Sequence, residues 1–141
     1  MNLSEYVRYD ALGLAELVAA RQVSPQELAE CAAAAVEAIN PAVNAVVETY
    51  PDRIEDLNEK TLGNGPFRGV PFLIKDVYGH EAGRRIEFGS RLCKDMRVAA
   101  DTHVFELFKA AGVNVLGRSA APEVSSGSRP PMSSPIGECR R

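Results

Sequence analysis

Helical segments alternate with short apolar segments along this chain, and that alternation restricts its fold more than any other feature. Apolar residues recur at helical spacing in three stretches, at residues 11–21, 24–39 and 101–111. Short apolar runs of strand character follow or separate these stretches, at residues 45–47, 70–74 and 113–116. This order favours an α/β fold in which helices cover a buried and largely parallel sheet.

Punctuating residues predict where the elements begin and end. The Ser-Pro-Gln-Glu segment at residues 24–27 forms a capping box with proline at the first helical position, which predicts a helix start there. The Asn-Pro pair at residues 40–41 predicts its end, because a residue before proline is pushed out of the α region. Residues 51–60 are predicted to form a charged surface helix. Residues 63–66 are predicted to form a loop, and residues 76–100 no regular element.

The composition excludes several function classes. The net charge of the 141 residues is −3, which offers neither nucleic acid nor an anionic membrane an electrostatic footprint. No apolar run approaches the ~20 residues that cross a bilayer, and the first residues lack the basic and apolar regions of a secretory signal. Cys31, Cys93 and Cys139 fit neither a disulfide framework nor a zinc spacing. We therefore expect a cytoplasmic protein with reduced thiols and with neither a nucleic-acid nor a membrane partner.

Lys75 is the most informative candidate for chemistry. It ends the apolar run at residues 70–74, where part of its stem is expected to be buried. Burial disfavours a charged ammonium and would turn the lysine into a general base. The alternative is a structural lysine whose head reaches water or pairs with Asp76.

Four segments, in the same order, resemble the amidase-signature family of hydrolases, and together with the N-terminal helices the resemblance covers about residues 5–123. Gly-Val-Pro-Phe-Leu-Ile-Lys-Asp at residues 69–76 resembles the segment that bears the family's catalytic lysine. The other three are similar to the glycine-serine stretch, the helix, and the strand with its turn that follow the lysine in the family. They lie at residues 87–92, 101–112 and 113–123.

The resemblance implies an amidase-signature α/β/α fold with a central mixed sheet, of which only the N-terminal part is present. It also implies hydrolysis of carboxamide C–N bonds, or acyl transfer of the amidotransferase-subunit type, by a Ser–cis-Ser–Lys triad without metal or organic cofactor. Lys75 takes the catalytic lysine's place, and no other site residue carries over. The substrate of the full-length parent would be a small-molecule amide. The serine-rich segment at residues 125–128 comes too early and lacks the flanking glycines of the family's nucleophile segment.

The pattern changes near Val124. Residues 1–123 are expected to be the N-terminal part of the amidase-signature domain, and residues 124–141 an aberrant, disordered tail rich in serine, proline and arginine. We interpret the change as a truncation or a frameshift, which predicts that this chain is inactive by itself. The rival hypothesis is a non-catalytic α/β interaction module in which Lys75 is structural.

Two further groups of residues are weaker candidates. His103 and Glu106 lie one helical turn apart, as metal ligands often do, but a third ligand is missing and a solvated pair is the better interpretation. The polar segment at residues 80–85 either borders the active-site mouth or is exposed to solvent.

Overall fold

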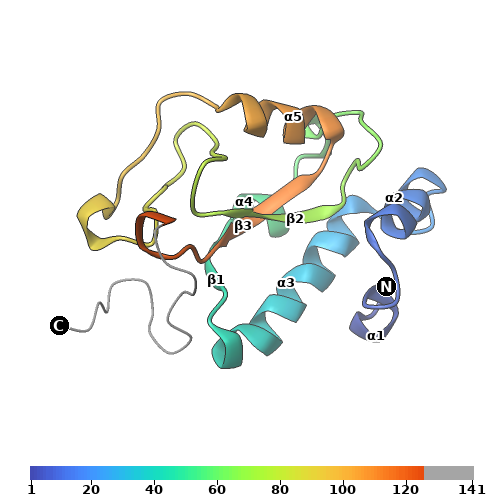
Figure 1. Cartoon of the computed structure of the whole chain (residues 1–141). Helices are drawn as coiled ribbons and strands as arrows, with labels where there is room; N and C mark the ends of the chain where they lie inside the picture. The colour runs from blue at the N-terminus through green and yellow to red at the C-terminus, as the bar shows by residue number, and fades with distance from the viewer. Residues whose placement is uncertain (126–141) are drawn as a thin grey trace.

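The computed structural model describes residues 1–125 and consists of a three-stranded sheet with helices on both faces (Figure 1). The α-helices are α1 (Leu3–Tyr6), α2 (Ala11–Ala19), α3 (Pro25–Val43), α4 (Pro51–Ile54) and α5 (His103–Ala111). The strands are β1 (Val46–Thr49), β2 (Pro71–Lys75) and β3 (Asn114–Ser119). Single 3₁₀ turns lie at Glu59–Thr61, Arg91–Cys93 and Glu123–Ser125. The tail predicted at residues 124–141 lies almost wholly outside the described residues.

The sheet has the order β1-β3-β2, with β3 in the centre. β2 runs parallel to β3, as the sequence pattern predicts, whereas β1 pairs antiparallel with β3. The largely parallel sheet expected from the pattern is therefore wrong for β1, and the mixed sheet implied by the resemblance is confirmed. An antiparallel edge strand on an otherwise parallel sheet is common in such folds.

Successive residues of β3 supply the two halves of the core. Val115 faces α5, where it packs with Phe105, Ile74 and Tyr50. Leu116 faces the opposite side and packs against Ala29 and Ala32 of α3. Because neighbouring side chains of a strand point to opposite faces, this one strand ties both helices to the sheet.

The start of α3 agrees with its prediction and the end does not. Ser24 accepts a hydrogen bond from the Glu27 amide at 3.1 Å, and Glu27 accepts one from the Ser24 amide at 2.9 Å. At the other end the helix runs through Pro41 to Val43, so the predicted end at residues 40–41 is wrong. A proline near a helix end removes a single backbone hydrogen bond. The Asn40 side chain stabilises the exit, because its Oδ1 accepts from the amides of residues 45 and 46.

The charged helix predicted at residues 51–60 is also wrong. Only Pro51–Ile54 is α-helical, and a turn and the 3₁₀ segment follow it. Within the described residues, no helix is long and apolar enough to cross a membrane.

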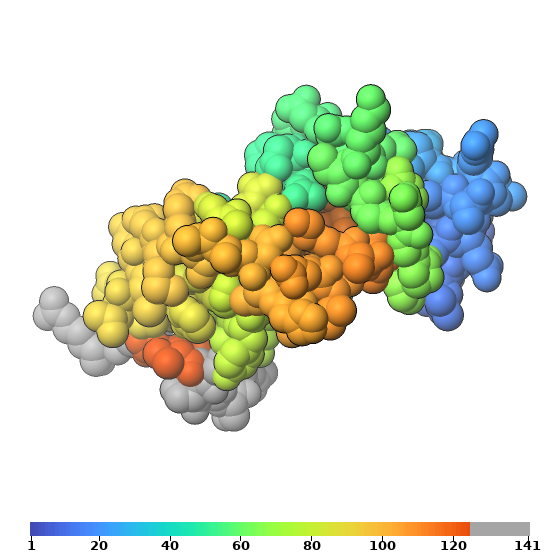
Figure 2. Space-filling model, turned by 90° about the horizontal axis from the view of Figure 1, so that it is seen from above, coloured from blue at the N-terminus to red at the C-terminus, as the bar shows by residue number. Residues whose placement is uncertain are grey.

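The glycine-rich segment at residues 63–69 packs backbone against backbone on the end of α5. A Cβ on Gly63 would lie 2.0 Å from the Lys109 carbonyl oxygen, and one on Gly65 would lie 2.3 Å from that of Ala110. The amide of Gly69 donates to the Gly112 carbonyl at 2.8 Å. Figure 2 shows α5 lying across this face between that segment and residues 85–100. The loop leads directly into β2 and fixes where that strand begins.

Candidate active site at the end of β2

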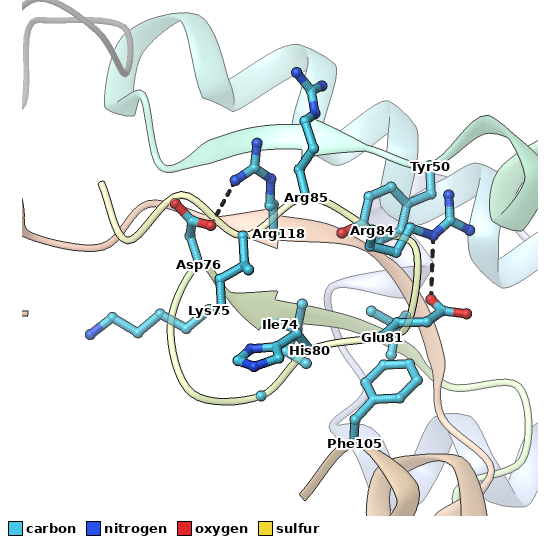
Figure 3. A pocket seen from close by; sticks show the side chains of 13 residues that line it. Tyr50, Ile74, Lys75, Asp76, His80, Glu81, Arg84, Arg85, Phe105 and Arg118 are labelled. Carbon is cyan, nitrogen blue, oxygen red and sulfur yellow. Dashed lines mark hydrogen bonds and ion pairs between the residues drawn. The ribbon is translucent and has the colours of Figure 1, made fainter. Parts of the chain in front are cut away.

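Lys75 is the last residue of β2, at the carboxyl end of the two parallel strands. In open α/β sheets, ligands bind at that edge. The side chain is exposed and points away from the Asp76 carboxylate (Figure 3). Among the described residues, the Lys75 ammonium has no hydrogen-bond or ion-pair partner. The proposed pairing with Asp76 is therefore wrong, and the head of Lys75 extends to the surface.

Asp76 has other partners. Its side chain is fully buried, and Arg118 Nη1 donates to Oδ1 at 2.6 Å. The amides of Glu87 and Gly89 donate to the two carboxylate oxygens at 2.9 and 3.1 Å. The Asp76 amide donates to the Ser119 carbonyl at 3.0 Å, which continues the pairing of β2 with β3. The residue after Lys75 is thus held by both its main chain and its side chain.

Arg118 lies at the centre of a buried charge cluster, which we define as Arg118 with its three carboxylate partners Glu48, Asp76 and Glu87. Its side chain is 3% exposed, and its nitrogens lie 2.7, 2.6 and 2.5 Å from the three carboxylates. Arg85 adds a second cation on the outer side, 2.5 Å from Glu48. The cluster joins β1, β2, β3 and the loop at residues 86–90.

The charges in the cluster stabilise one another against the cost of burial. Burial raises the pKa of Glu87, but the Asp95 amide and Arg118 outweigh it, so the pKa lies below its ordinary value. Burial likewise raises the pKa of Glu48, and hydrogen bonds from Arg85 and Arg118 lower it further than burial raises it. Burial lowers the pKa of Arg118, whereas its carboxylate partners, first Glu87 and then Asp76, raise it overall. These three groups are therefore charged at neutral pH.

The loop after β2 encloses a cavity of about 10 Å³ beside Lys75, large enough for about one water. As one alternative predicts for residues 80–85, this loop borders the candidate site, because His80, Glu81, Arg84 and Arg85 line the cavity with Lys75. Burial lowers the pKa of His80, and its buried Nδ1 has no hydrogen-bond partner in residues 1–125. The ring is therefore neutral at pH 7.

Arg84 and Glu81 are engaged in contacts with the segment around α4. The Arg84 guanidinium lies 4.2 Å from the centre of the Tyr50 ring and 2.6 Å from Asp52. Glu81 lies 2.5 Å from Arg53. The cavity wall is thus tied to the rest of the fold by a chain of ion pairs.

The remaining candidates lie away from Lys75 or play supporting roles. His103 and Glu106 form an exposed pair at 3.5 Å, which confirms the solvated interpretation. Ser90 donates to Glu123 at 3.0 Å, which joins the glycine-serine stretch to the turn after β3. Of the serine-rich segment only Ser125 is described, and residues 126–128 lie outside the described part of the chain.

Sequence reasoning missed Glu48, Glu87 and Arg118. One signal was present, because Arg118 belongs to a strand that is otherwise apolar and small, and an arginine is almost never fully buried unless it is paired. That rule predicts carboxylate partners but cannot identify them. The three partners lie 31 to 70 residues away in the sequence.

Comparisons with known proteins agree with this geometry. The Amidase family model matches residues 27–135. The 6-aminohexanoate-cyclic-dimer hydrolase of Paenarthrobacter ureafaciens is 33% identical over 122 residues, which are 83% of this chain and 24% of that protein. The acylamidase of Rhodococcus erythropolis is 32% identical over 120 residues, which are 80% of this chain and 25% of that protein.

The fold has the same relatives. The structure of a 6-aminohexanoate cyclic dimer hydrolase with its substrate superimposes with a TM-score of 0.74 at 34% identity, and covers 82% of this chain and 24% of that one. This chain therefore spans about a quarter of the length of the relatives it matches. With the family model matching most of its residues, the chain belongs to the amidase family.

Proposed function

We propose that Lys75 is the general base of a Ser–cis-Ser–Lys triad that hydrolyses the C–N bond of a small carboxamide. The observation that carries the proposal is the contrast between Lys75 and Asp76. The main chain at this point is fixed by the Asp76 contacts, while the Lys75 ammonium has no partner among residues 1–125. A structural lysine would instead use its charge in an ion pair, so the interaction-module hypothesis is the weaker one.

The chemistry follows from the properties of a neutral amine. A lysine accepts a proton only in its neutral form, and removal from water favours that form. Lys75 is exposed in the described part of the chain, so the proposal requires that the rest of a complete enzyme covers it. The bridging serine and the serine nucleophile are placed in that remaining part. Lys75 would take the proton through the bridging serine as the nucleophile attacks the carbonyl.

The proposed substrate class comes from what the relatives have in common. A cyclic-dimer hydrolase and an acylamidase both take their names from the hydrolysis of their substrates, and the acylamidase names the amide directly. We therefore propose a carboxamide substrate and hydrolysis as the reaction, with no metal or organic cofactor.

The test is a chimera in which residues 1–123 replace the matching segment of the Paenarthrobacter hydrolase, a segment that is 33% identical. The chimera is assayed for opening of the 6-aminohexanoate cyclic dimer. Lys75→Ala and Lys75→Arg should both abolish turnover, because arginine stays protonated and cannot act as a base. Lys60→Arg, a change at an exposed lysine of a 3₁₀ turn, serves as the control. A Lys75→Arg chimera that keeps most of the rate would refute the general-base role.

A further inference from the structure

We propose that Arg118 is a positioning residue that sets the place of Lys75 through Asp76. This inference rests on the proposed function of Lys75, but its structural half can be tested without activity. No hydrogen bond or ion pair joins the Arg118 side chain to Lys75 in the described residues. The influence of Arg118 passes through one carboxylate, that of the next residue in the chain.

The first step is the contact between Arg118 and Asp76. Arg118 Nη1 and Asp76 Oδ1 are 2.6 Å apart, and both side chains are buried. A buried carboxylate that loses its cation is strongly destabilised, so Asp76 keeps its place only while Arg118 is present. The remaining nitrogens of Arg118 are held by Glu48 and Glu87, which leaves the guanidinium little freedom to shift.

The second step is the loop that Asp76 holds. The amides of Glu87 and Gly89 both donate to its carboxylate, and Phe88 between them has a positive φ of 54°. A positive φ is unfavourable for a residue with a side chain and persists only where its surroundings enforce it. Arg118 and Asp76 therefore fix the end of β2 and the facing loop as one unit. Lys75 lies at the edge of that unit with its backbone fixed and its head free.

The first experiment follows hydrogen exchange in the 141-residue chain by NMR. Arg118→Ala should accelerate exchange at the Glu87 and Gly89 amides about ten- to a hundredfold, the range expected for bonds to a charged group. Arg53→Ala is the matched control, because Arg53 also pairs with two carboxylates, Asp52 and Glu81, but does not contact Asp76. Equal exchange at the two amides in Arg118→Ala and the parent chain would overturn the proposal, and so would fast exchange in the parent chain itself.

The second experiment measures turnover in the chimera, with kcat expressed per folded enzyme. Arg118→Ala should lower kcat roughly a hundredfold with little change in KM, as expected for a misplaced catalytic group. Added guanidinium chloride at tens of millimolar should restore part of kcat, whereas tetramethylammonium at the same ionic strength should not. A purely structural role would lower the amount of folded enzyme but would leave kcat per folded enzyme unchanged, and that result would overturn the proposal.

The two proposals fail in different ways. If Lys75→Ala leaves turnover intact, the general-base function fails, whatever the exchange data show. If Lys75→Ala abolishes turnover but Arg118→Ala changes neither kcat nor exchange, only the positioning role fails.

Discussion

Phe105 is the side chain by which α5 is anchored to the sheet, and replacing it tests that arrangement. The ring is 1% exposed and packs with Tyr50, Ile74 and Val115. It also lines the small cavity beside Lys75. Phe105→Ala removes most of this contact and leaves a void that the surrounding side chains fill only in part. Truncations of this kind cost about 3–5 kcal/mol of unfolding free energy.

That loss is large relative to the total stability of a domain, about 5–15 kcal/mol. It should lower the thermal midpoint by roughly 10–20 °C. Urea unfolding followed by circular dichroism should show a lower midpoint with an unchanged slope, because the mutation changes stability rather than the surface exposed on unfolding.

Leu107→Ala is the matched control on the same helix. Leu107 is 55% exposed, so its truncation should change the unfolding free energy by about 0.5 kcal/mol or less. Two variants with equal losses would show that α5 does not pack on the sheet through Phe105, and the described core would then be wrong.

Three further predictions concern pH, helix capping and activity. Because burial lowers the pKa of His80, the unfolded chain binds protons first and stability should fall as the pH drops below about 6.5. Glu48 and Glu87 also have lowered pKa values, so their contribution should be lost as the pH falls below about 4.5, and urea midpoints that stay constant from pH 7.5 to 4 would contradict both effects. Ser24→Ala should cost about 1 kcal/mol and Ser24→Gly only a few tenths, as measured by thermal unfolding, and equal losses would exclude the capping bond as their cause. The purified 141-residue chain should hydrolyse none of a panel of aliphatic and aryl amides, and turnover that Lys75→Ala removes would disprove this.

Elements with local signals could be predicted from the sequence. The start of α3 depends on four consecutive residues, and α5 on its Thr102 cap and Gly112 end, so both were found where expected. The failures are also local in origin. The rule for a residue before proline predicted the end of α3, but the Asn40 side chain supports three more residues. The charged pattern at residues 51–60 resembles a helix, yet the structure uses most of that segment as turns.

The site was only half predictable for a different reason. Lys75 ends an apolar run, which a sequence displays directly. The cluster around Arg118 depends on residues from three strands and a loop, and strand order is not written in any short segment. β1 and β3 are neighbours although they are about 70 residues apart, and only that neighbourhood brings Glu48 to Arg118. The missing information is therefore topological.

The glycines that pack on the end of α5 have a consequence for how this protein can vary. A Cβ on Gly63 or Gly65 would lie within 2.3 Å of the carbonyl oxygen of Lys109 or Ala110, and no rotation of a side chain can relieve a clash with the main chain. Drift of the sequence can therefore exchange the chemistry of this segment at Asn64, whose side chain is not part of that contact, while the course of the backbone stays constant. Insertions are excluded for the same reason, since an added residue would lift the chain from the helix end. Evolution can therefore change the surface beside β2 without changing the distance along the chain from α5 to Lys75.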